Sequence, residues 1–151
     1  KVGYIVVNKL SYAGQVCLIW VGNFIGTFLM AYLILNTRIS GIAEKAAAMC
    51  VTKVNDGPLS IFILAFFCGI LMFIAADGWK NIENQVARTL AVFLPVVVFI
   101  LSGFEHCIAN MFYFSIAQAW DAHSLLWLLV MTLGNAAGGM FIPFCRIAFV
   151  D

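Results

Sequence analysis

The sequence predicts an all-α integral membrane protein that contains four membrane-spanning helices, one of them interrupted. Of the 151 residues, 64% are hydrophobic and only 10% are charged. A soluble domain, by comparison, is about half apolar and a quarter charged. The mean hydropathy of this chain is correspondingly high, at +1.05. The charged residues divide the chain into long uncharged blocks, and one further apolar block carries a glutamate and a histidine at its centre.

The lengths of these blocks predict the spans, because a helix needs about 20 residues to cross a hydrocarbon core. Residues 10–37, 57–76 and 124–145 carry no charge over 28, 20 and 22 residues. The fourth block has 32 residues, which is too long for one straight span and too short for two joined by a loop. We therefore expect one membrane domain over residues 1–151, with spans at about 13–36, 58–76, 89–120 (broken near 102–106) and 124–145.

The segments between the spans predict an orientation in the membrane. Residues 41–50 are rich in Ala and predict a short helix at the membrane interface. Cytoplasmic loops carry more Lys and Arg than the loops on the other side. Here one side holds five such residues and the other three: Lys1, Lys9, Lys80, Arg88 and Arg146 against Arg38, Lys45 and Lys53. We therefore expect a multi-pass protein of the cell membrane, inner or plasma, with both ends of this segment in the cytoplasm.

Charge and cysteine usage argue against several function classes. The net charge is +1 without a basic cluster, so nucleic acid is not an expected partner. The five cysteines include no C-x-x-C pair, and the chain has only two histidines, so we expect no metal or iron–sulfur cofactor. There is also no Ser/His/Asp set and no phosphate-binding loop. We therefore do not expect an enzyme.

The pattern G-N-x-x-G occurs in the middle of both the first and the last span. Small residues four apart allow helices to approach closely, and an Asn within a bilayer needs a polar partner or cavity. Since the two spans run in opposite directions, the repeat predicts inverted-topology halves, each placing one Asn near the midplane. The residues concerned are Gly22, Asn23 and Gly26 in the first span, and Gly134, Asn135, Gly138 and the following Gly139 in the last.

Glu105 lies at the centre of the interrupted block. A carboxylate at the centre of a span costs roughly 2.5–3.5 kcal/mol, so it requires a partner. The favoured interpretation is a structural anchor, satisfied by backbone amides freed at Gly103 and by a cation; the alternative is direct contact with a solute. Lys53, just before the second span, is the only cation expected to reach it from the outer side. We therefore predict an ion pair between Lys53 and Glu105.

Four residues of the interrupted block, Phe99, Gly103, His106 and Asn110, recur at intervals of four, three and four. If the break is mild, this spacing places them on one helical face. Such a face would line a conduit with an aromatic constriction, a small residue and a titratable imidazole. A lone buried histidine is more often structural. Two observations nevertheless favour a lining role for His106. Lipid alone cannot satisfy the backbone groups freed at the adjacent break, and the amide of Asn135 is available as a polar neighbour.

The motif G-F-E-H-C-I-A-N-M-F at residues 103–112, with G-N-x-x-G in the first span and L-G-N-A-A-G-G in the last, resembles the formate/nitrite transporter family, which includes hydrosulfide channels. The resemblance covers nearly the whole chain. It implies an aquaporin-like, inverted-repeat helical bundle, usually a homopentamer with one conduit per protomer. It aligns the four spans with helices three to six of a six-helix protomer, and residues 1–9 with the end of helix two. It therefore implies a partial protomer.

The resemblance also implies roles for individual residues. His106 becomes the pore histidine, Asn135 its neighbour and Phe99 an outer-constriction residue. A supporting polar network consists of Glu105, Asn110 and Lys53. The implied activity is passage of a small monovalent anion or its conjugate weak acid through a pore with apolar constrictions, because an anion alone pays a large desolvation cost there.

Alternatives from other classes are open. A neutral-solute channel of the aquaporin type would need Asn-Pro-Ala caps, and none of the three prolines follows an Asn. An ammonium channel would need two pore histidines, but His123 is expected in a turn. A structural membrane subunit without transport activity is the third alternative, against which the intramembrane polar residues argue. No residue selects among formate, nitrite and hydrosulfide.

Overall fold

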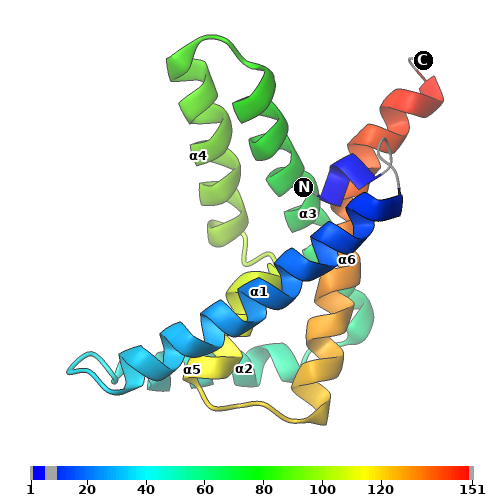
Figure 1. The fold of residues 1–151 in the computed structure, drawn as a ribbon. Coiled ribbons are helices and arrows are strands. Elements are labelled where there is room, and N and C mark those ends of the chain that lie inside the picture. Colours follow the sequence, from blue (N-terminus) through cyan, green and yellow to red (C-terminus); the bar gives the residue numbers. More distant parts are fainter. Residues whose placement is uncertain (1, 6–9, 150–151) are drawn as a thin grey trace.

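The computed structural model describes residues 2–5 and 10–149, and every regular element within them is a helix. The all-α prediction is thus confirmed. Three segments, residues 12–35, 58–81 and 122–149, are long and apolar enough to cross a membrane. The elements, shown in Figure 1, are η1 (Val2–Ile5), α1 (Leu10–Leu35), α2 (Ile42–Val54), α3 (Pro58–Asn81), α4 (Gln85–Leu101), α5 (Cys107–Ile116) and α6 (Ala122–Phe149).

Several helix ends differ from the predicted spans. α3 continues five residues beyond residue 76, because Asp77 and Lys80 end an apolar block without ending a helix. α5 stops at Ile116, short of residue 120, and Gln118 then adopts a positive φ of 52°. α2 extends four residues beyond the expected 41–50. Two parts of the predictions lie outside the described residues. They are Lys1 and Lys9, which enter the charge count, and residues 6–9, which belong to the expected end of helix two.

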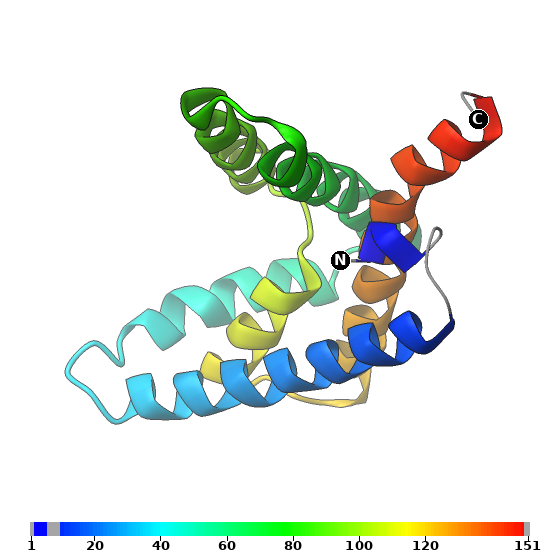
Figure 2. The ribbon, with the colours of Figure 1, turned by 45° about the horizontal axis from the view of Figure 1, so that its top comes forward.

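The helices form two connected groups. α3 and α4 make an antiparallel hairpin, and α3 also packs along α6 in the most extensive helix contact of the described chain (Figure 1). α5 lies between α1 and α2 (Figure 2), where Ala31, Ala46 and Ile116 are buried together. The turn between α4 and α5 therefore joins the hairpin to the second group.

Glycines bring α3 and α6 into backbone contact. A Cβ on Gly138 would collide with the carbonyl oxygen of Phe66, and one on Gly134 would lie 2.7 Å from the carbonyl oxygen of Phe62. Gly69 of α3 is in the same position, since a Cβ there would collide with the Asn135 carbonyl oxygen and lie 2.9 Å from the Gly139 nitrogen. Small residues therefore set the α3–α6 separation, as close helix pairs in membranes require.

The matching glycines of α1 behave differently. At Gly22 and Gly26 an added Cβ would meet nothing within 4 Å. Neither glycine is therefore in close contact with another described helix, and the packing role predicted for Gly22, Asn23 and Gly26 stays a prediction. Asn23 instead donates to the carbonyl of Ile19 in its own helix, at 2.8 Å.

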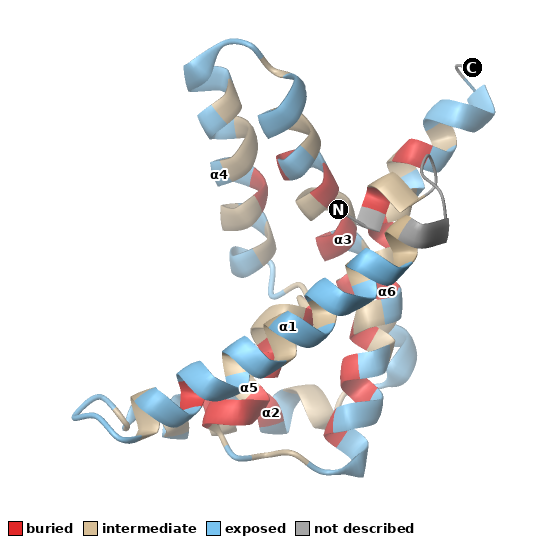
Figure 3. Ribbon diagram, in the orientation of Figure 1, coloured by how far each residue is buried: buried red, intermediate tan, exposed pale blue. Residues whose placement is uncertain are grey.

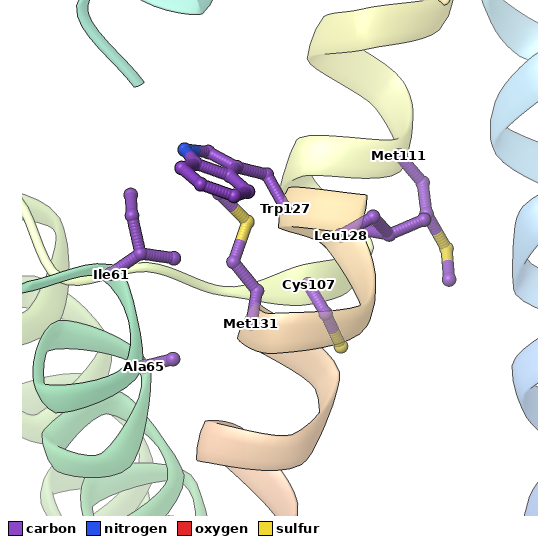
Figure 4. Packing of buried hydrophobic residues seen from close by; sticks show 7 residues of the cluster. All are labelled: Ile61, Ala65, Cys107, Met111, Trp127, Leu128 and Met131. Carbon is purple, nitrogen blue, oxygen red and sulfur yellow. The ribbon is translucent and has the colours of Figure 1, made fainter. Parts of the chain in front are cut away.

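The packed interior is small and the apolar exterior is large. One buried cluster joins α3, α5 and α6 (Figure 4), while much of α1, α3 and α4 is exposed (Figure 3). Exposed side chains include Leu18, Leu101 and Phe93. An apolar surface of this extent is typical of a protein whose solvent is lipid or neighbouring membrane helices.

The start of α6 carries a hydrogen-bonded cap. The Asp121 carboxylate accepts from the Ser124 backbone N–H at 2.6 Å, and the Ser124 hydroxyl oxygen accepts from the Asp121 N–H at 2.8 Å. These two residues satisfy amides that a helix start leaves without partners. The hydrogen bonds from Ser124 hold the pKa of Asp121 below its usual value of 3.8.

We expect Asp121→Ala to lower the unfolding temperature at neutral pH, because the cap is lost, whereas Asp121→Asn retains an acceptor and has a smaller effect. A lowered folded pKa means that the stabilisation is present above the unfolded pKa and is lost as pH falls through the folded value. Thermal unfolding against pH should therefore show the wild-type and Asp121→Ala curves converging below pH 3.8. A difference that is constant across the whole pH range contradicts this assignment.

Candidate functional site

The interrupted span is built around a turn at residues 102–106. α4 ends at Leu101, Gly103 adopts a φ of +67°, and α5 starts at Cys107. A positive φ of this size favours glycine, so Gly103 has a conformational role at this turn. Gly103 is exposed and an added Cβ would meet open space. It is not among the residues that line the two cavities described below, and its predicted lining role stays a prediction.

The side chain of Asn135 holds the turn from α6. Its Oδ1 accepts from the Cys107 backbone N–H at 2.8 Å. Its Nδ2 donates to the carbonyl of Glu105 at 2.8 Å and to the carbonyl of Ala65 at 2.7 Å. One amide thus bonds backbone groups on both α3 and the broken segment. Those of the broken segment would otherwise lack partners in a membrane interior.

Glu105 is the second fixed point of the turn. The Lys53 ammonium lies 2.7 Å from Oε1 and 2.6 Å from Oε2, and the exposed fractions of the two side chains are 12% and 6%. Asn110 Nδ2 donates to Oε2 at 2.7 Å and to the His106 carbonyl at 3.0 Å. The carboxylate is therefore neutralised and hydrogen-bonded, as a buried charge must be.

His106 caps the start of α5. Its Nδ1 accepts from the Ile108 backbone N–H at 3.2 Å. Since Nδ1 acts as an acceptor, this hydrogen-bond pattern assigns the proton of the neutral imidazole to Nε2. The ring centroid lies 5.7 Å from that of Phe99, at the far side of the turn.

Two cavities meet this imidazole. The first, of about 490 Å³, is widely open to the surface, and it is lined by residues of α1, α4 and α5 together with His106, Phe99 among them. The second, of about 630 Å³, lies among η1, α1, α3, α5 and α6 and includes Asn135. Asn23, His106 and Ile108 line both. The structure thus brings His106 to a wall that the two cavities share.

The prediction that four residues share one helical face is wrong. Phe99 and His106 line the first cavity, but Asn110 is 1% exposed and points to Glu105. The reason is the turn at Gly103, which reorients α5 so that the spacing of a continuous helix no longer applies. Asn110 therefore belongs with Glu105 rather than with the cavity wall.

Asn23, for which the sequence predicts helix packing and a need for a polar partner or cavity, lines both cavities. One contribution escaped the sequence reasoning. Trp127 of α6 was not singled out, and its indole N–H donates to the carbonyl of Lys53 at 3.0 Å. An indole inside an apolar span needs an acceptor. That general requirement was the available signal for Trp127, although it does not identify the acceptor.

A family model described as "Formate/nitrite transporter" matches residues 7–149. The chain is 25% identical over 162 residues to a formate-nitrite transporter of Plasmodium ovale, and this alignment covers 95% of this chain and 51% of that protein. It is 27% identical over 138 residues to the formate channel BtFdhC of Bacillus thuringiensis, which covers 83% of this chain and 52% of that protein.

A solved structure described as a pentameric formate channel with formate bound has the same fold. The TM-score is 0.74 at 24% sequence identity, and the match covers 95% of this chain and 70% of that one. The chain spans about half the length of the curated relatives it matches.

Proposed function

The chain belongs to the formate/nitrite transporter family, and from this premise we propose that it carries a small monovalent anion, or the conjugate weak acid, across the membrane past His106. Formate, nitrite and hydrosulfide are the candidate solutes. The proposed activity is transport and not catalysis, and it needs no cofactor. The proposed location is the cell membrane, with both ends of this segment in the cytoplasm.

The observation that carries this proposal is the position of the imidazole on a wall common to two cavities. Its Nδ1 is engaged by Ile108, so Nε2–H is the donor left for a solute. A small anion between apolar walls pays a large desolvation cost, which a hydrogen bond or a transferred proton reduces. Histidine is suited to this task because its imidazole can donate a hydrogen bond through one nitrogen while the other accepts, and it can also take up a proton.

The remaining polar residues support this site in the proposal. Lys53 and Asn110 hold Glu105, and Asn135 holds the backbone on each side of His106. Because the charges of Lys53 and Glu105 cancel, the passage has no uncompensated carboxylate to repel an anion. Their proposed role is to keep the break rigid and electrically neutral.

Phe99 is the proposed constriction residue beside the histidine. Its ring lies 5.7 Å from the imidazole and lines the first cavity. An aromatic wall at this point favours a neutral solute over a hydrated ion, because it offers no groups to replace the hydration shell. It therefore selects for the protonated acid.

A homopentamer is the proposed assembly. The solved relative is described as pentameric, and this chain has exposed apolar faces on α1, α3 and α4 that suit lipid or neighbouring protomers. In the proposal each protomer contains its own passage, and the complete passage includes parts of the protomer beyond the described helices.

We expect His106→Phe to flatten or abolish the pH dependence of flux, because the substitution keeps an aromatic ring at the site but removes its titratable donor. The measurement is uptake of formate, nitrite and hydrosulfide against pH by full-length protein in proteoliposomes. His123→Phe is the matched control, since it removes the other histidine of the chain and leaves the cavity wall unchanged.

Unaltered pH-dependent uptake in His106→Phe would rule out the proposed role of the imidazole. Passage of glycerol without any of the three anions would indicate a neutral-solute channel instead.

A further inference from the structure

Trp127 links two distant parts of the chain at the Lys53–Glu105 pair. Its indole N–H, on α6, donates to the backbone carbonyl of Lys53 at 3.0 Å, across 74 residues of sequence. Lys53 lies in the last turn of α2, where carbonyls lack partners within the helix. The same carbonyl also accepts from the Asp56 N–H at 3.2 Å. The Lys53 carbonyl is thus held by two donors that lie outside its own helix.

The ammonium of Lys53 needs such a fixed base. It reaches both oxygens of Glu105 from α2, at 2.6 and 2.7 Å, through a flexible four-carbon stem. Ordering this stem costs rotamer entropy, and if the Lys53 backbone were mobile, fixing the backbone would add to that cost. A bond that fixes the Lys53 carbonyl therefore favours the ion pair without contacting it.

Trp127 itself is held on several sides. It is 8% exposed and packs with Ile61 and Met131 in the cluster of Figure 4. The ring of His123, one turn earlier in α6, lies 4.3 Å from its ring centroid. The indole is thus a rigid donor, which is the requirement for positioning another group.

We propose that Trp127 is a positioning residue for transport: it fixes the last turn of α2, so that Lys53 neutralises Glu105 beside His106. This inference rests on the proposed function. Loss of the indole N–H leaves the Lys53 carbonyl with its local backbone donor alone and loosens the last turn of α2. The Glu105 carboxylate is then partly uncompensated near the passage, which weakens the approach of an anion.

Trp127→Phe tests the proposal, because it keeps an aromatic ring in the core and removes the donor. Hydrogen–deuterium exchange of residues 51–56 in the full-length protein is expected to rise about twofold to tenfold, the range that loss of one hydrogen bond produces. The apparent KM for formate uptake is expected to rise by a similar factor of about twofold to tenfold.

Trp120→Phe is the matched control. Its indole also donates one hydrogen bond, to the Ser115 hydroxyl at 3.1 Å, and it packs against the same core cluster. It makes no such bond to Lys53, so exchange at residues 51–56 and the KM should stay at wild-type values. Equal effects of the two variants would show a general cost of losing an indole, and would overturn the positioning role.

A variant without the ion pair completes the test. Lys53→Met combined with Glu105→Gln has no buried charge to position, so adding Trp127→Phe should change the KM no further. A further rise in KM would overturn the proposal, as would unchanged exchange in Trp127→Phe. If the wild-type protein carries none of the anions, the proposed function fails, whereas the exchange measurement still decides whether Trp127 fixes α2.

Discussion

Replacement of Lys53 by methionine is expected to lower the free energy of unfolding by about 3–5 kcal/mol, because it leaves a buried carboxylate without its counter-charge. Glu105 is 6% exposed at its side chain, and its only remaining side-chain donor is Asn110 among the contacts described. Denaturant or thermal unfolding of the purified protein in detergent measures this loss.

Two further variants serve as controls for Lys53→Met. Lys45→Met removes an exposed lysine from the same helix and is expected to change stability by no more than about 0.5 kcal/mol. The double variant Lys53→Met with Glu105→Gln removes both charges and should recover much of the loss, since no unpaired charge is left. Equal losses for Lys45→Met and Lys53→Met would contradict the structural importance of the ion pair.

Gly138→Ala is expected to destabilise the protein by about 3 kcal/mol or more, because an added methyl group in a packed backbone contact forces the helices apart. The new Cβ would collide with the carbonyl oxygen of Phe66, which is part of α3 and has little freedom to move. The measurement is again unfolding in detergent, with recovery of folded protein as a second readout.

The control for this prediction comes from the repeated motif itself. Gly26→Ala makes the same change at the corresponding place in α1, where an added Cβ would meet nothing within 4 Å. It should be neutral or stabilising by up to about 1 kcal/mol, since Ala is the better helix former. If Gly26→Ala is as damaging as Gly138→Ala, the close α3–α6 contact is not the cause.

The sequence allowed good prediction of features that depend on local composition. An apolar block too long for one span, with Gly103 and Glu105 at its centre, predicted an interrupted helix, and the structure has a turn there. The cost of a buried carboxylate pointed to Lys53, and the structure contains that ion pair. In both cases the physical requirement was strong and few residues met it.

The direction that a helix takes after a turn could not be predicted from the sequence. The positive φ of Gly103 reorients α5, so the spacing from Phe99 to Asn110 does not place these residues on a common face. The two G-N-x-x-G motifs look alike, yet Gly138 meets backbone while Gly26 meets open space. Periodicity describes one helix at a time, and these differences arise from what lies opposite it.

The start of α5 has a consequence for anything that enters the neighbouring cavities. The first two amides of the helix already have partners inside the protein: Cys107 N–H bonds to Asn135, and Ile108 N–H bonds to His106. An incoming molecule therefore does not need to hydrogen-bond these two amides, and neither amide loses its partner when the molecule leaves. The start of α5 can therefore keep the same conformation with the neighbouring cavities occupied or empty.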